Sequence, residues 1–202
     1  MYRKFMKRVM DLIICFLAFP LFILIFLVVG ILIKLEDGGP ILYKSERIGK
    51  KFKIFNMYKF RTMRVNAPKI LNDDGSTYNA ENDERVTKLG KILRETSIDE
   101  TAQIINVIFG QMSVVGPRAS LSGAVGTFKN DEMDKMSVRP GVTGLTQAYY
   151  RNSLTSREKR VKDANYAKSI TFIGDFKIMG KTFFTILKRD AIYTNSIKKD
   201  EK

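Results

Sequence analysis

The stretch that decides the fold is LIICFLAFPLFILIFLVVGILI, from Leu12 to Ile33, in which no residue carries a charge. A continuous helix of this length would extend about 33 Å, which matches the hydrocarbon thickness of a bilayer. The sequence therefore predicts a membrane anchor over residues 1–36. A chain of 202 residues leaves room for one further core, so we expect residues 37–202 to form a single globular domain at the membrane face.

Basic residues flank the apolar run on both sides, and such residues resist transfer across a membrane. Those before the run are Arg3, Lys4, Lys7 and Arg8, and those after it are Lys34, Lys44, Arg47, Lys50, Lys51 and Lys53. Pro20 lies inside the run, where it removes a backbone hydrogen bond and kinks a helix. The pattern predicts a re-entrant helical hairpin that breaks at Pro20, with both ends on the cytoplasmic face. A single spanning helix is the alternative.

The composition limits the partners and the chemistry. A net charge of +14 and a pI near 9.8 require an anionic partner, which could be nucleic acid, an anionic lipid surface or a phosphorylated substrate. Nucleic acid is disfavoured, since the chain has no zinc motif, aromatic RNA-binding signature or clear helix-turn-helix. There is no histidine, which excludes a histidine base or metal ligand. The single cysteine, Cys15, excludes an intrachain disulfide.

The segment after the apolar run predicts a β-hairpin. The turn residues Gly38-Gly39-Pro40 precede a stretch from Ile41 to Arg61 that is centred on Gly49-Lys50-Lys51. In its second arm, alternation places Phe52, Ile54, Tyr58 and Phe60 on one face. Lys59 and Arg61 then lie together on the other face.

Two further segments show helical spacing. Apolar residues recur from Ser97 to a stop at Gly110, and a second series predicts one or two amphipathic helices near the C-terminus. This second series is Tyr166, Ile170, Phe172, Phe176, Met179, Phe183 and Leu187. It allows either core packing or a position in the lipid interface. The expected fold class is α+β and mainly helical, with a short hairpin and amphipathic interfacial helices.

The strongest candidate for chemistry is the pair Asp99-Glu100, at the start of the helix predicted after Ser97. The alternative is structural, because Ser97-x-x-Glu100 fits a capping box. Basic residues near tight turns favour chemistry on phosphates, namely Lys59, Arg61, Arg94, Arg118 and Arg139. A carboxylate can attack a phosphorus atom only if cations neutralise the surrounding oxygens.

Several blocks in one order then give a resemblance. They are Lys7-Arg8 with Asp11, Lys59-Phe60-Arg61-Thr62-Met63, Ser97-Ile98-Asp99-Glu100, Met112-Ser113-Val114-Val115-Gly116-Pro117-Arg118, and Arg139-Pro140-Gly141-Val142-Thr143-Gly144-Leu145. Together they resemble the bacterial sugar transferase family, the monotopic phosphoglycosyl transferases. The resemblance extends from Lys7 to about Ile186 and is far more specific than any one block.

The resemblance implies an enzyme at the cytoplasmic membrane that moves a sugar phosphate from a UDP-sugar to polyprenyl (undecaprenyl) phosphate and releases UMP. Such a reaction is the first membrane step in assembling a glycoconjugate. Asp99 would be the nucleophile and a Mg²⁺ ligand, and Glu100 would act as acid or base toward the carrier phosphate. Lys59, Arg94 and Arg118 would hold phosphates, and Arg139 would contact UMP.

The chain departs from the family pattern at several places. The usual Ser-Pro break corresponds to Ile23-Leu24, so the hairpin breaks there or at Pro20. Tyr150 stands where relatives often carry glycine. The sequence leaves open the sugar, the polyprenol length, the glycan pathway and the oligomeric state, a homodimer included. The alternative function is a catalytically inactive membrane scaffold for glycan-assembly enzymes.

Overall fold

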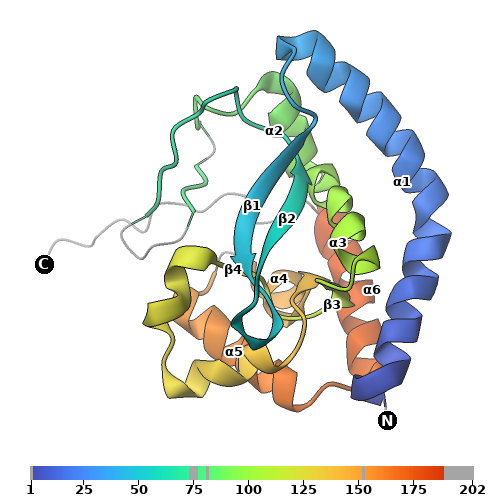
Figure 1. The fold of residues 1–202 in the computed structure, drawn as a ribbon, viewed down its shortest axis with the longest axis vertical. Helices are drawn as coiled ribbons and strands as arrows, with labels where there is room; N and C mark the ends of the chain where they lie inside the picture. Colours follow the sequence, from blue (N-terminus) through green and yellow to red (C-terminus); the bar gives the residue numbers. More distant parts are fainter. Residues whose placement is uncertain (1, 73–76, 81, 152, 189–202) are drawn as a thin grey trace, which may run out of the picture.

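A computed structural model describes residues 2–72, 77–80, 82–151 and 153–188. In it a long, curved N-terminal helix runs along one side of a body that contains a β-hairpin and several shorter helices (Figure 1). The described residues are mostly helical with a small sheet, which agrees with the α+β, mainly helical class predicted from the sequence. The boundary between the anchor and the globular domain stays a prediction.

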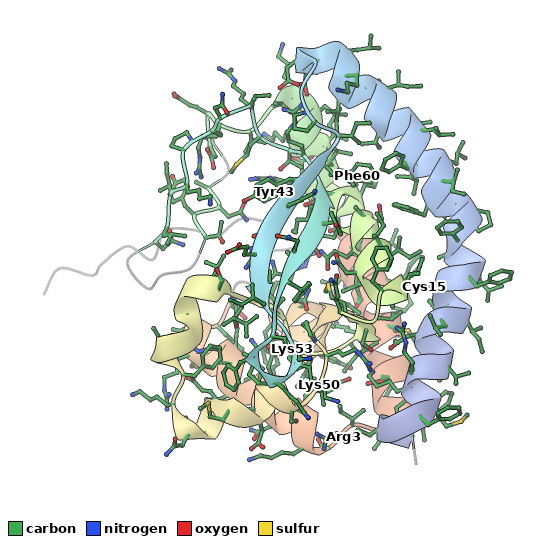
Figure 2. All side chains as sticks on the ribbon, viewed as in Figure 1. Arg3, Cys15, Tyr43, Lys50, Lys53 and Phe60 are labelled. Atoms are coloured by element: carbon green, nitrogen blue, oxygen red, sulfur yellow. The ribbon has the colours of Figure 1, made fainter. Side chains whose placement is uncertain are left out.

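The long helix is α1 (Lys7–Asp37), which follows a π-helical turn (Tyr2–Met6) and ends at Gly38 with a φ of 70°. By length and composition, it is the one helix in the described ranges that is long and apolar enough to cross a membrane. A stripe at one- or two-turn spacing is buried, and it comprises Lys7, Asp11, Cys15, Phe22, Val29, Gly30 and Ile33. Most other apolar side chains of α1 are exposed, with Phe16 79% and Leu35 78% accessible. Cys15 points from α1 toward the body (Figure 2).

Helix α1 is not divided into two arms. The sequence predicted a break at Pro20 or near Ile23-Leu24, whereas α1 continues through all three residues as a single bent helix (Figure 1). A proline removes one hydrogen bond and clashes with the preceding turn, which bends a helix when strong helical neighbours lie on both sides. Curvature is therefore what the structure shows in place of a hairpin.

The predicted β-hairpin is confirmed. Strands β1 (Leu42–Ile48) and β2 (Ile54–Phe60) pair in antiparallel register, with a 3₁₀ turn (Lys50–Phe52) at the tip. A short strand β4 (Ser120–Leu121) adds to the other edge of β1, so that the sheet order is β2-β1-β4. Strand β2 is thus an edge strand whose outer backbone groups need partners from elsewhere.

The face predicted to be apolar in the second arm is wrong for its first half. Ile54 is 58% exposed, whereas Phe55 and Met57 from the opposite face are buried against Cys15 of α1. Phe60 is buried in a separate cluster with other α1 side chains. The strand therefore changes its buried face between Met57 and Phe60. Its first half packs with Val107 and its second half with Leu93 and Ala102, in addition to α1.

The helical segment predicted from Ser97 to Gly110 is present. After α2 (Lys88–Glu95), it begins as a 3₁₀ helix η3 (Ile98–Gln103) and continues as α3 (Ile104–Ile108). Gly110 ends it with a φ of 74°. Strand β3 (Ser113–Val115) follows and pairs in parallel with β5 (Gly141–Thr143). Two 3₁₀ helices, Ser122–Thr127 and Asn130–Ser137, lie between these strands in sequence.

The predicted amphipathic segment near the C-terminus forms two helices, α5 (Ser156–Lys168) and α6 (Phe172–Lys188), after a short α4 (Leu145–Tyr149). Core packing explains Tyr166 of α5, which is buried, and part of the role of Ile170 and Met179, which pack against the same cluster. It does not explain the large apolar side chains of α6 that are exposed, namely Phe172, Ile173, Phe176, Phe183, Phe184 and Leu187. The lower half of α1 and α6 lie side by side (Figure 1), joined by an ion pair between Lys7 and Asp175.

A buried asparagine satisfies the outer edge of β2. Asn106 of α3 accepts a hydrogen bond from the backbone N–H of Tyr58 (2.9 Å) and donates to the carbonyl of Asn56 (2.7 Å). It also donates to the side chain of Gln111 (2.7 Å). The side chain thus bonds to the free edge of β2 as the backbone of a neighbouring strand would, and it fixes the position of α3 against the hairpin.

Replacing this side chain should destabilise the protein. Asn106→Leu keeps the approximate volume but leaves two backbone groups of β2 unsatisfied, at a cost of about 2–4 kcal/mol. Urea unfolding of detergent-held protein, followed by circular dichroism, measures the loss. Asn56→Ala is the matched control, because the exposed Asn56 contributes only its backbone carbonyl. Equal stability of Asn106→Leu and the wild type would contradict this role.

Candidate active site

The pair Asp99-Glu100 lies in the first turn of η3, after Ser97 in a left-handed conformation (φ 58°). The Ser97 side chain makes no capping hydrogen bond, and only its carbonyl accepts from the Glu100 N–H (3.2 Å). The capping box that the sequence allowed is therefore not formed. A non-glycine residue in this region carries strain, and both carboxylates that follow it lie toward Lys59 of the hairpin.

Lys59 of β2 meets both carboxylates. Its Nζ lies 2.6 Å from Glu100 Oε1 and 3.5 Å from Asp99 Oδ2. Glu100 thus holds the lysine closely, while Asp99 shares it at a longer distance. Asp99 is 6% exposed, and a carboxylate this buried requires positive charge nearby.

Two arginines add to the positive charge around the pair. Arg118 lies 3.9 Å from Glu100 Oε1, and half of its side chain is exposed (52%). Arg94 of α2 donates to Thr62 (2.9 Å), and its positive charge acts on Asp99. Three of the five predicted phosphate-binding residues are therefore gathered around Asp99 and Glu100.

The two carboxyl groups differ in pKa. Burial raises the pKa of Asp99; the charge of Lys59 opposes this shift, and the negative charge of Glu100 adds to it. Burial would also raise the pKa of Glu100, but Lys59 and Arg118 outweigh it and lower that pKa to about 2. Environments that shift the pKa values of two neighbouring acids in opposite directions are typical of catalytic pairs.

The turn that carries Arg118 is fixed by close backbone packing between β3 and β5. A Cβ on Gly116 would lie 2.6 Å from the carbonyl of Arg139, and one on Gly141 would lie 2.1 Å from the Gly116 nitrogen. Only glycine fits at such distances. Gly116 N–H donates to Thr143 and Gly141 N–H donates to Pro117, both at 2.9 Å.

A buried carboxylate that was not among the predicted site residues also stabilises this turn. Asp163 of α5 accepts from the backbone N–H of Arg118 (3.0 Å) and the hydroxyl of Thr146 (2.9 Å). Lys135 lies 3.3 Å from it and balances its charge. No local motif marks Asp163, because its partners come from distant parts of the chain.

The other two predicted phosphate ligands lie elsewhere. Arg61 contacts Asp37 at the end of α1 and donates to the carbonyls of Pro40 (2.7 Å) and Met63 (3.0 Å). Arg139 donates to the carbonyl of Gly110 (2.7 Å), at the opposite end of the helix that begins with Asp99. The structure gives both arginines structural contacts and does not bring them to the pair, so their roles in binding phosphate stay predictions.

Arg47 of β1 is a site residue that the sequence analysis did not select. Its pKa is lowered to about 10 by burial and by the charge of Arg118, while Glu100 and Tyr43 act in the opposite direction. The signal that would have identified Arg47 is the hairpin register, which pairs Tyr43 with Lys59. Alternate residues of β1 share a face, so Arg47 falls on the same face as Lys59.

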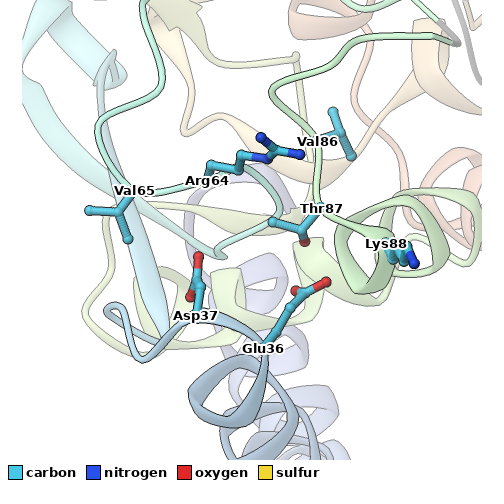
Figure 3. A pocket seen from close by; sticks show the side chains of 7 residues that line it. All are labelled: Glu36, Asp37, Arg64, Val65, Val86, Thr87 and Lys88. Atoms are coloured by element: carbon cyan, nitrogen blue, oxygen red, sulfur yellow. The ribbon is translucent and has the colours of Figure 1, made fainter.

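A separate hollow lies near the C-terminal end of α1 (Figure 3) and encloses about 490 Å³. Its lining is formed by Glu36, Asp37, Arg64, Val65, Val86, Thr87 and Lys88. The hollow does not include Asp99 or Glu100. Part of the contact between α1 and the body lies beside it, since Glu36 accepts a hydrogen bond from the N–H of Leu89 (3.1 Å).

Comparison with known proteins identifies the family of this chain. The model of the bacterial sugar transferase family matches residues 2–189. The chain belongs to this family. Both carboxylates, Lys59, Arg94 and Arg118 lie within the matched range, as does the whole of α1.

Curated relatives are similar over most of this chain. An undecaprenyl-phosphate galactose phosphotransferase of Salmonella typhimurium is 34% identical over 205 residues, which covers 94% of this chain and 42% of the relative. A UDP-N-acetylgalactosamine-undecaprenyl-phosphate N-acetylgalactosaminephosphotransferase of Aeromonas hydrophila is 36% identical, covering 91% and 44%. The exopolysaccharide production protein PSS of Rhizobium leguminosarum is 36% identical, covering 86% and 88%. This chain spans less than half the length of the first two relatives.

Removing Lys59 should destabilise the fold in a pH-dependent way. The lowered pKa of Glu100 contributes stability above its ordinary value of 4.5, and this contribution is lost as the pH falls through about 2. Lys59→Gln should therefore cost about 2 kcal/mol at neutral pH. The cost should shrink as the pH is lowered toward about 4, because the variant's carboxyl groups then take up protons.

Chemical unfolding of detergent-held protein at several pH values tests this. Lys44→Gln in the neighbouring strand removes an exposed lysine and serves as the control, with little change expected at any pH. A loss for Lys59→Gln that is independent of pH would show that the two carboxylates do not depend on this charge.

Proposed function

We propose that this protein is a phosphoglycosyl transferase. It moves a sugar-1-phosphate from a UDP-sugar to undecaprenyl phosphate, releases UMP, and so begins the membrane-bound assembly of a polysaccharide or other glycoconjugate. The family membership and the names of the relatives above support this reaction class.

The observation that carries the proposal is the arrangement of Asp99 and Glu100. The pair is not used to cap its helix, and its carboxylates are turned toward cations from three separate elements. Nearby cations that are shared between two acids have the capacity to bind the oxygens of a diphosphate. A purely structural pair would need neither Arg94 nor the half-exposed Arg118.

In the first step, a carboxylate oxygen of Asp99 attacks the phosphorus that bears the sugar. A new P–O bond forms to Asp99, the bond from that phosphorus to the bridging oxygen breaks, and UMP leaves with the bonding electrons. Asp99 is the better nucleophile of the two, because Lys59 lies closer to Glu100 (2.6 Å) than to Asp99 (3.5 Å).

In the second step, a phosphate oxygen of the polyprenyl phosphate attacks the same phosphorus. The bond to Asp99 breaks, which releases the polyprenyl diphosphate sugar and restores the carboxylate. Glu100 accepts the proton of the incoming phosphate where it carries one. The covalent intermediate allows the two substrates to use the site in turn.

The proposed cofactor is Mg²⁺, with Asp99 as its protein ligand. Mg²⁺ in phosphoryl-transfer sites usually takes one or two carboxylates and completes its shell with phosphate oxygens and water. The adjacent carboxylates of Asp99 and Glu100 fit this donor set, although the described residues contain no cluster of three acidic, histidine or cysteine side chains. When bound, the ion would neutralise charge on the diphosphate.

The protein is proposed to be monotopic at the cytoplasmic membrane, with its globular part in the cytoplasm. Both ends of α1 contact the same body: Lys7 pairs with Asp175, and Asp37 pairs with Arg61. A helix perpendicular to the membrane would separate these two ends by the bilayer. The curvature of α1 and the exposed apolar side chains of α1 and α6 instead support a re-entrant helix that enters and leaves by one face.

Loss of the nucleophile should abolish the reaction. Protein in nanodiscs is incubated with Mg²⁺, undecaprenyl phosphate and a panel of UDP-sugars, and UMP release and lipid-linked product are measured. Asp99→Asn should reduce both to background, because an amide does not form the acyl-phosphate bond. Asp134→Asn, which alters an exposed ion pair with Lys168, is the matched control and should retain wild-type activity.

The same panel distinguishes the proposed enzyme from the scaffold. Wild-type protein that is folded and membrane-bound but releases no UMP with any sugar would favour the scaffold. Wild-type turnover in Asp99→Asn would overturn the nucleophile assignment and leave the reaction class in place.

The re-entrant arrangement predicts that both ends of α1 are on the cytoplasmic side. Arg3→Cys and Lys34→Cys, each in a Cys15→Ala background, should be protected from a membrane-impermeant maleimide in intact cells and should react after lysis. A spanning helix would expose one position to the reagent outside the cell and protect the other, so labelling of one end alone would refute the proposal.

A further inference from the structure

Arg47 lies on β1, between β2, which carries Lys59, and β4, which follows the turn of Arg118. In the β1–β2 register Tyr43 pairs with Lys59, which places the face of Tyr43, Ser45 and Arg47 next to the lysine. On its other side β1 pairs with β4, where Arg47 is opposite Leu121. Leu121 follows the turn of Arg118 by three residues. Arg47 is therefore positioned beside Arg118 and near Glu100 by backbone pairing on both edges of its strand.

The guanidinium of Arg47 has no carboxylate partner within the described part of the chain. Its Nε donates to the hydroxyl of Ser45 at 3.2 Å, and none of the ion pairs among the described residues includes it. The buried or nearly buried cations elsewhere differ in this respect. Lys7 pairs with Asp175, Arg61 with Asp37 and Lys135 with Asp163.

This difference requires an explanation, because a charge removed from water is normally paired. Arg47 is partly buried and has another arginine as its electrostatic neighbour; burial and, after it, the charge of Arg118 lower its pKa. The charge of Glu100 acts on Arg47, but Glu100 is already held closely by Lys59. An anion that is not part of the protein would relieve the repulsion between the two arginines.

We propose that Arg47 and Arg118 together bind one phosphate group of a substrate, in a subsite on the Glu100 side of the carboxylate pair. This proposal rests on the proposed function. A planar guanidinium offers two parallel N–H donors to a phosphate, and two such groups match the charge of a phosphate dianion. The group comes either from the donor, as the phosphate that departs with UMP, or from the acceptor, as the phosphate of the polyprenyl carrier.

The test uses the full chain in nanodiscs and compares Arg47→Gln, Arg47→Lys and the control Lys44→Gln. The loss of charge-assisted hydrogen bonds in Arg47→Gln should raise KM for one substrate by about 10- to 100-fold. Arg47→Lys should recover part of this loss, since it keeps the charge but not the paired donors. Lys44 is exposed and lies over the ring of Tyr58, so its variant should match the wild type.

Exchange of labelled UMP into the UDP-sugar without lipid separates the two sources. Weakened exchange in Arg47→Gln assigns the subsite to the donor. Normal exchange with a raised KM for polyprenyl phosphate assigns it to the acceptor. Thermal stability supplies a further readout, because a variant that removes an unpaired charge should unfold at the same temperature as the wild type or higher.

Unchanged KM values for both substrates in an active Arg47→Gln protein would overturn the proposal and leave the proposed function intact. If the wild type shows no activity, direct binding measurements still test the subsite. Affinities for UMP and for undecaprenyl phosphate are measured directly, and a loss of affinity in Arg47→Gln alone would support the subsite even if no sugar were transferred. Equal affinities in wild type and Arg47→Gln would refute it.

Discussion

Two carboxylates on consecutive residues cannot be buried together unless positive charge reaches them from elsewhere in the chain. In this protein Asp99 and Glu100 lie on a short 3₁₀ helix, and Lys59 reaches them from β2. The hairpin and the helix must therefore pack as one unit. Asn106 makes this packing specific, because it bonds to the β2 backbone at residues 56 and 58.

Glu100 also connects this unit to a second one. Arg118 approaches it from the turn after β3, and that turn is fixed by glycine contacts between β3 and β5 and by Asp163 of α5. The site thus depends on two rigid parts that are built independently, with Glu100 between their cations. Asp163 binds the backbone N–H of Arg118, while the guanidinium of Arg118 lies 3.9 Å from Glu100.

The sequence predicted those parts of the structure that depend on local patterns. The apolar run, the hairpin around Gly49 and the helix ending at Gly110 are signalled by composition and turn residues. The buried face of β2 was misplaced at Ile54, since α1 and α3 decide which side of the strand is covered. The break at Pro20 is absent for a similar reason, because contacts at both ends of α1 favour a bend over two arms. Asp163 acts through partners far along the chain, and no motif marked it; Arg47 was marked only by the register of the hairpin.

The position of α1 and the position of the site constrain each other. In the proposed reaction, one substrate is dissolved in water and the other is confined to the bilayer, so the carboxylate pair must lie at a fixed depth near the interface. A single anchor point would let the domain tilt and change that depth. Contacts at both ends of α1, through Lys7 and Asp37, remove this freedom. In the proposed membrane arrangement, the exposed apolar face of α6 would add a second surface beside α1, and a domain held along two helices would keep its orientation while the substrates exchange.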